Sequence, residues 1–110
     1  MITLFHAPQS RSSRIIWLLE ELGVSYEIRP VSIFRPMTGE GQPDPANPHP
    51  DKRVPVLVHG DALIPESVAI VLYLADAFPL AGLAPAPGDA RRGAYLGWIG
   101  WYATELEQAL

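Results

Sequence analysis

Hydroxyl and guanidinium side chains gather in the segment Ser10-Arg-Ser-Ser-Arg14, just where the apolar periodicity of a helix begins. The positive end of a helix dipole, free N–H groups, a serine hydroxyl and Arg11 together favour an anion, and a thiolate is one such anion. The simpler interpretation is that these serines are helix N-caps, which satisfy orphan backbone amides. The segment therefore predicts either a capped helix start or an anion site.

Two further local features could bind a peptide-like ligand. Val54-Pro55 precedes an apolar strand, where proline is most often an edge device, but a cis bond would expose the Val54 backbone to an extended ligand. Glu66-Ser67 opens a helix after Pro65, and capping is again the simpler explanation. The Glu66 carboxylate could also hold an ammonium group and the helix N-terminus a carboxylate. An α-amino acid carries these two charged groups, an ammonium and a carboxylate, on its α-carbon.

The composition limits the chemistry that this chain can perform. Its 110 residues include no cysteine, and 12 acidic against 8 basic side chains give a net charge of −4. The chain therefore has no disulfide framework, cysteine nucleophile or Cys-x-x-Cys pair, and any thiol must arrive with a ligand. The acidic balance argues against nucleic acid, and the scattered histidines (His6, His49 and His59) indicate no metal site.

The N-terminal residues and the apolar runs predict a cytoplasmic protein that does not span a membrane. The first eight residues show no basic leader followed by a long apolar stretch. The longest continuous apolar run, residues 68–75, is far shorter than the ~20 residues that a membrane-spanning helix needs.

The elements that must position these residues begin with a strand, a helix and a second strand. Residues 2–5 are apolar and partly β-branched. From Ser12 onward an apolar stripe predicts a helix, which Gly23 stops after Leu22. Residues 26–31 alternate apolar and charged side chains, and Pro30 favours a sheet edge. This succession predicts a βαβ unit with parallel strands.

A hairpin and a helix follow a proline-rich segment. Seven of the twelve prolines lie between residues 30 and 55, so this stretch should be a loop without a long helix. Residues 54–58 and 62–64 read as two strands joined by a tight turn. Residues 67–78 are apolar almost all round, which predicts a buried helix on a mixed four-stranded sheet.

The remaining residues have the composition of a linker and then a helix. Prolines, glycines and alanines from 79 to 89 indicate a domain boundary. Beyond it, aromatic residues recur at helical spacing, and such residues usually bury against neighbours (Tyr95, Trp98, Trp101 and Tyr102). If nothing covers them, they form an apolar patch of the kind that drives association, so we expect a homodimer or a fragment of a longer protein.

The chain resembles the N-terminal, thioredoxin-like domain of cytosolic glutathione transferases of bacterial type. The resemblance rests on three motifs at family-like separations: residues 10–23, Arg53-Val-Pro-Val-Leu57, and Glu66-Ser-Val-Ala-Ile-Val-Leu-Tyr-Leu74. It implies an α/β fold, a βαβ-ββα mixed four-stranded sheet followed by the start of an all-α domain. The domains would be residues 1–80 for glutathione binding, 81–89 as linker, and 90–110 as the first helix of a truncated C-terminal domain.

Carried over by position, the resemblance implies Ser10 as the thiol-activating hydroxyl, with Ser12 and Ser13 as competitors. The backbone of Val54, ahead of a cis Pro55, would pair with the cysteinyl part of glutathione. Glutathione's γ-glutamyl ammonium and carboxylate would meet Glu66 and Ser67, and its glycyl carboxylate would face Arg53. Unlike the commoner Asn-Pro-x-Gly-Lys of the family, this chain has His49-Pro-Asp-Lys-Arg53.

The resemblance implies a glutathione transferase that conjugates or reduces small hydrophobic electrophiles in detoxification, active or inactive as this short chain. Glutathione would be the co-substrate, with no metal. The alternative is a non-catalytic dimerisation or protein-interaction module of the same family. A thioredoxin-type disulfide oxidoreductase is excluded because the chain has no cysteine.

Overall fold

The computed structural model describes residues 1–109, which form two compact units. The first covers residues 1–71 and the second begins at residue 72, so the boundary falls inside helix α2 (Ser67–Ala77). The predicted linker at residues 81–89 stays a prediction. Within the described residues, no helix combines the length and the hydropathy that crossing a membrane requires.

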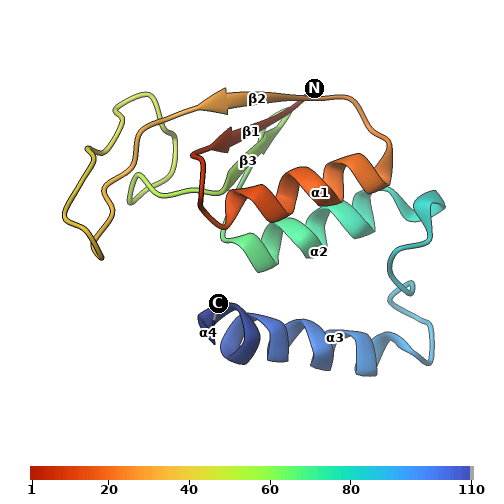
Figure 1. Cartoon of the computed structure of the whole chain (residues 1–110). Helices are drawn as coiled ribbons and strands as arrows, with labels where there is room; N and C mark the ends of the chain where they lie inside the picture. Colours follow the sequence, from red (N-terminus) through yellow and green to blue (C-terminus); the bar gives the residue numbers. More distant parts are fainter. Residues whose placement is uncertain (110) are drawn as a thin grey trace. The chain divides into compact units, whose positions relative to one another are not determined.

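A four-stranded mixed sheet forms the centre of the first unit (Figure 1). Its strands are β1 (Ile2–His6), β2 (Tyr26–Pro30), β3 (Val56–His59) and β4 (Ala62–Pro65), in the order β2-β1-β3-β4. β1 pairs with β2 in parallel and with β3 antiparallel, and β3 pairs with β4 antiparallel. The predicted fold class and the edge position of the second strand are confirmed.

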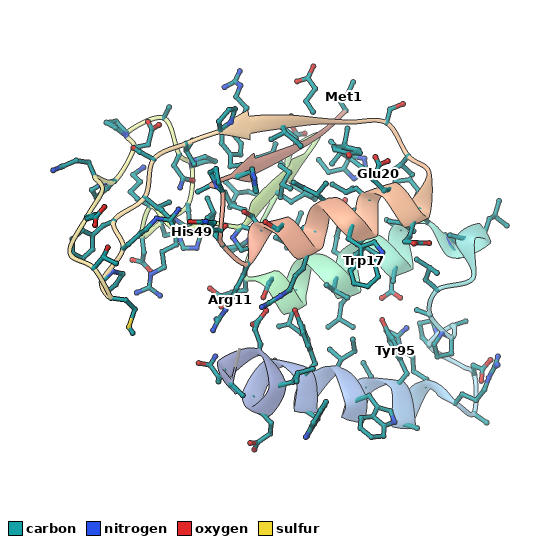
Figure 2. The ribbon with its side chains drawn as sticks, viewed as in Figure 1. Met1, Arg11, Trp17, Glu20, His49 and Tyr95 are labelled. Atoms are coloured by element: carbon teal, nitrogen blue, oxygen red, sulfur yellow. The ribbon has the colours of Figure 1, made fainter. Side chains whose placement is uncertain are left out.

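Helix α1 (Ser12–Leu22) connects β1 to β2 and has the bounds that the apolar stripe predicts. It ends because Gly23 adopts a left-handed φ of 70°, and the Gly23 N–H donates to the carbonyls of Leu19 and Glu20. The buried stripe of α1 includes Ile15 and Leu19, while Trp17 is exposed (Figure 2).

One row of paired residues crosses the sheet and fixes where the loops emerge. Phe5 of β1 pairs with Val56 of β3, which in turn pairs with Pro65 of β4. Phe5 and Val56 form a buried cluster with Val31, whereas the adjacent pair Leu4 and Leu57 is buried on the opposite face because side chains alternate along a strand.

The segment from residue 31 to residue 53 contains no helix or strand, as its prolines predict. An isolated bridge between Arg35 and Glu40 closes a turn within it. Gly41 in this segment has a φ of +85°, and a Cβ there would lie 2.0 Å from the carbonyl oxygen of Ile33. The loop backbone therefore packs closely despite its irregular course.

Helix α2 is less buried than its apolar composition predicts. Ile70 and Leu74 are fully buried, but Asp76 and Ala77 are exposed and much of the helix is half-buried. A helix that is apolar all round can be buried on any face, but in this chain only the face that carries Ile70 and Leu74 is fully buried.

The second unit continues from α2 into the short 3₁₀ helix η1 (Pro79–Ala81) and then helix α3 (Arg92–Trp101). A π-helical turn, η2 (Tyr102–Leu106), and a last turn, α4 (Glu107–Ala109), follow without interruption. The predicted final helix is thus present from residue 92 to residue 109, and its last expected residue, Leu110, lies outside the described residues.

The aromatic side chains of α3 differ from the expectation that they bury against neighbours. Trp98 is 68% exposed and Trp101 47% exposed, and their rings meet edge to face at a centroid distance of 5.7 Å. Tyr95 is half-buried beneath the Arg92 guanidinium, which lies 5.2 Å from its ring centroid and pairs with Asp76 at 3.0 Å. Within residues 1–109 nothing covers the tryptophan rings, which is the condition under which the sequence predicts an apolar patch, because helical spacing sets a shared face and not what covers it.

Candidate functional site

The three sequence motifs emerge at the same end of the sheet. Since Phe5, Val56 and Pro65 form one row, the loop after β1, the residues before β3 and the residues after β4 all leave the sheet beside that row. These segments carry Ser10, Val54-Pro55 and Glu66-Ser67 respectively. The carboxyl end of a strand beside a helix N-terminus is where α/β folds commonly bind ligands.

Two serines and a histidine form a continuous hydrogen-bonded chain at the junction of β1 and α1. The Ser12 hydroxyl lies 2.7 Å from Nδ1 of His6 and 2.6 Å from the Ser10 hydroxyl. Ser10 also donates to the carbonyl oxygen of Ala7 at 2.6 Å. Ser12 has no exposed surface, whereas Ser10 is half-buried. Of the two serines, Ser10 is therefore the one that a ligand can reach.

These bonds bear out only part of the N-capping expectation, because the Ser10 hydroxyl accepts from one early amide but no serine is the N-cap residue. The N-cap of α1 is Arg11, which makes no side-chain cap bond. The Ser12 N–H lies 3.3 Å from the Ser10 hydroxyl, and the N–H of Ser13 donates to the Ser10 carbonyl. The early amides are thus satisfied by the tight turn, and what the junction offers an anion is the Ser10 hydroxyl rather than a row of free amides.

Sequence reasoning gave no role to His6 or Arg35, although both hold this junction. Burial lowers the pKa of His6 below its ordinary 6.5, which favours the neutral imidazole. Arg35, from the segment after β2, donates to the carbonyls of Pro8 at 2.6 Å and Gln9 at 3.2 Å. His6 could have been noticed as a polar residue ending an apolar strand six positions before Ser12, but no sequence signal links Arg35 to residues 8 and 9.

A second turn, from Asn47 to Arg53, positions the residues that precede β3. The fully buried Asn47 donates from its side-chain amide to the Arg53 carbonyl at 2.9 Å and accepts from the His49 N–H at 3.0 Å. His49, labelled in Figure 2, is also buried, and its Nδ1 accepts from the Asp51 N–H at 2.9 Å. Asn47 therefore fixes the backbone just before Val54, a role that its sequence did not reveal.

Lys52 closes this turn from a backbone conformation that few side chains adopt. It has a φ of +56°, in the left-handed region that favours glycine, and the resemblance noted above likewise implies glycine at this position. Its ammonium group donates to the Asn47 carbonyl at 2.7 Å. A lysine can thus occupy this backbone conformation because its side chain closes the same turn.

The two remaining motifs lie on either side of the β3–β4 hairpin. The Val54–Pro55 bond is cis, and Val54 stands two residues before the paired residue Val56. Glu66 is exposed with a φ of +75°, and Ser67, at the start of α2, is buried. Arg53 is exposed. The register thus brings all the predicted site segments to one end of the sheet, from positions up to 57 residues apart in the chain.

A cavity lies apart from the predicted site residues. A cavity of about 640 Å³ in the second unit is lined by the stretch after η1 together with Asp76 and Tyr95, and none of the predicted site residues lines it. Among residues 1–109, no group of three histidine or acidic side chains could hold a metal ion.

Comparison with known families gives one match that covers most of the chain. The sequence model of the family described as "Glutathione S-transferase, N-terminal domain" matches residues 1–76. Glutathione S-transferase 3 of Schizosaccharomyces pombe is 38% identical over 74 residues, which are 67% of this chain and 29% of that protein. A glutathione S-transferase of Triticum aestivum is 40% identical over 76 residues, 69% of this chain and 33% of that protein.

Solved structures of similar fold extend the match beyond residue 76. A glutathione transferase from Methylococcus capsulatus aligns with a TM-score of 0.80 at 28% identity, over 98% of this chain and 53% of that one. A sphingomonad glutathione S-transferase complexed with glutathione aligns with a TM-score of 0.79 at 31% identity, over 97% of this chain and 53% of that one. The chain thus spans about a third of the length of these curated relatives and about half of these solved structures.

Proposed function

Because the chain belongs to the glutathione S-transferase family through its N-terminal domain, we propose that it binds glutathione and activates the thiol for attack on a small hydrophobic electrophile. The observation that carries this proposal is the row Phe5–Val56–Pro65, which brings the three motif segments to one end of the sheet. The sphingomonad relative, solved with glutathione, supports the same ligand for this chain.

Each motif segment would bind one part of glutathione. The Val54 backbone beside Pro55 would pair with the cysteinyl unit, and Glu66 and Ser67 would hold the γ-glutamyl ammonium and carboxylate. Arg53 would attract the glycyl carboxylate, and its exposure leaves the guanidinium accessible for that role. Of the two candidate catalytic residues, the half-buried Ser10 would donate to the thiolate and the buried Ser12 would act behind it.

One hydroxyl is sufficient for the activation step. Lowering a thiol pKa of about 8.5 by about two units stabilises the thiolate by roughly 2.7 kcal/mol relative to the thiol. A hydrogen bond to a charged group contributes about 1.5–3 kcal/mol, and a helix N-terminus about 0.3–1 kcal/mol. The roughly 2.7 kcal/mol required lies within the range of the one bond from the Ser10 hydroxyl, so no general base is needed.

Glutathione-agarose retention and a conjugation assay with an activated aryl halide test the proposal. Ser10→Ala should lower turnover about 10- to 100-fold, the loss of one charge-assisted hydrogen bond, while retention persists. Ser13→Ala is the matched control because Ser13 is exposed on the same turn. Retention without turnover in the wild type would reject the enzyme function for this chain. Turnover that survives Ser10→Ala and disappears in Ser12→Ala would transfer the catalytic role to Ser12.

The alternative function is a non-catalytic dimerisation or protein-interaction module, which the exposed Trp98–Trp101 pair favours. We propose a homodimer in which a second copy covers these rings, with residues 81–89 as the linker between the glutathione-binding part and the helical part. Size-exclusion chromatography at high concentration should give a dimer for the wild type and a monomer for Trp98→Ser/Trp101→Ser. A 12.0 kDa wild-type monomer would reject the dimer. A cytoplasmic detoxification role is the setting in which this activity would operate.

A further inference from the structure

The hydrogen-bonded chain His6–Ser12–Ser10, with the Ala7 carbonyl at its end, has three short contacts but only two serine hydroxyl protons. The donor in each contact can therefore be deduced. Ser10 and Ser12 each have one hydroxyl proton. The carbonyl of Ala7 can only accept, and it lies 2.6 Å from the Ser10 hydroxyl oxygen, so that contact uses the Ser10 proton. The 2.6 Å contact between the two serines must then use the proton of Ser12.

The direction of the remaining contact follows from these two. Since Ser12 gives its only proton to Ser10, it has none for Nδ1 of His6, which lies 2.7 Å away. Two acceptors facing each other at that distance would repel, so Nδ1 must carry a proton and donate to Ser12. Ser12 then accepts from Nδ1 and from the Ala7 N–H at 3.4 Å and donates to Ser10 at 2.6 Å, because the other acceptor near its proton, the Ala7 carbonyl, is more distant at 3.3 Å and already accepts from Ser10. Ser12 is thus satisfied without exposure to water.

The opposite arrangement leaves a contact without a proton. If Nδ1 were bare, Ser12 would donate to it and Ser10 would have to donate to Ser12. The Ser10 hydroxyl oxygen and the Ala7 carbonyl oxygen would then face each other at 2.6 Å with no proton between them. In that arrangement Ser10 also has no proton left for a ligand.

We infer that His6 is a positioning residue whose Nδ1–H, acting through Ser12, directs the Ser10 hydroxyl proton toward the ligand thiolate. When no ligand is bound, the Ser10 hydroxyl donates its hydrogen bond to the Ala7 carbonyl, and a bound thiolate competes with that carbonyl as the acceptor. No proton is transferred along the chain. The inference rests on the proposed function for its ligand, but the direction of the hydrogen bonds stands on the geometry of the unliganded site.

The lowered pKa of His6 decides which protonated form supplies the Nδ1–H. Burial disfavours the imidazolium, so near neutral pH the ring is neutral and the proton on Nδ1 leaves Nε2 bare. This is a definite tautomer, and nitrogen NMR distinguishes it from the alternative.

The first test measures the tautomer of His6 in the wild-type chain. Two-bond and three-bond ¹H–¹⁵N correlations of the imidazole near neutral pH should assign a protonated Nδ1 and an unprotonated Nε2. A proton on Nε2 with a bare Nδ1 would overturn the inference. This readout needs no ligand, so it decides the role of His6 even if the chain fails to bind glutathione, which would instead reject the proposed function.

The second test replaces the donor at a matched position. In His6→Asn the amide nitrogen stands at the same number of bonds from Cβ as Nδ1 and still donates, whereas His6→Asp places only acceptors there. Ultraviolet titration of bound glutathione should give a thiol pKa close to wild type in His6→Asn and about one unit higher in His6→Asp, roughly tenfold less thiolate at a given pH. Equal thiol pKa values in the two folded variants would overturn the inference.

Discussion

Asn47→Ala should destabilise the first unit by about 1.5–3.5 kcal/mol, because its side chain makes two bonds from a fully buried position. The variant leaves the buried N–H of His49 without its acceptor, at a cost of about 1–3 kcal/mol. It also removes the donor to the carbonyl of Arg53, where exposure lets water substitute, so the added cost is only about 0.5 kcal/mol. Urea unfolding followed by circular dichroism measures the difference.

Asp44→Ala is the matched control for this prediction. Its carboxylate accepts from the N–H of Ala46 two residues on, at 2.9 Å, and from the N–H of Ser32 at 3.4 Å, and both bonds are exposed. Losing them should cost about 0.5 kcal/mol because water replaces exposed bonds. If the two variants lose equal stability, burial is not what makes the Asn47 bonds important, and the reasoning fails. Asn47→Ala should also weaken glutathione-agarose retention, because the backbone before Val54 is no longer fixed.

Three further variants test the loop and the second unit. Gly39→Ala should lower the free energy of unfolding by about 1 kcal/mol because Gly39 has a φ of +72°. Gly41→Ala should lower it clearly more, because the new Cβ would also clash with the Ile33 carbonyl oxygen. Equal urea midpoints for the two variants would contradict this reasoning. The Arg91 guanidinium lowers the pKa of Asp89 from 3.8 to about 2, so carboxyl NMR of Arg91→Gln should show that pKa rising toward 3.8. The stability from this depressed pKa is complete above about pH 3.8 and is lost as the pH falls through about 2; an unchanged Asp89 pKa in Arg91→Gln would refute the cause.

The fold was largely predictable because its elements have strong local signals. The stripe from Ser12 to Leu22 and the stop at Gly23 predicted α1 with its observed bounds. Parallel pairing of β1 and β2 followed from the βαβ succession, and the hairpin from two short apolar runs around a turn. In each case the residues that determine the element lie within it or beside it.

The details of the candidate site were less predictable because they depend on backbone paths that join distant segments. The serines of residues 10–13 were expected to cap α1, yet the turn at Ala7 brings a carbonyl and His6 within reach of their hydroxyls. Asn47 acts on a carbonyl six residues away through a turn that no periodicity describes. Likewise, the spacing of Trp98 and Trp101 identified a shared face but could not show that it is exposed.

The row Phe5–Val56–Pro65 would couple the proposed ligand binding to folding in one equilibrium. The segments beside it carry residues 10, 54–55 and 66–67, so they meet only when β1, β3 and β4 are paired, and an unfolded chain offers a ligand no comparable site. A ligand held by all three segments at 100 times its dissociation constant would therefore stabilise the folded state by about 2.7 kcal/mol. The cellular concentration of the ligand would thus also affect the fraction of this protein that is folded.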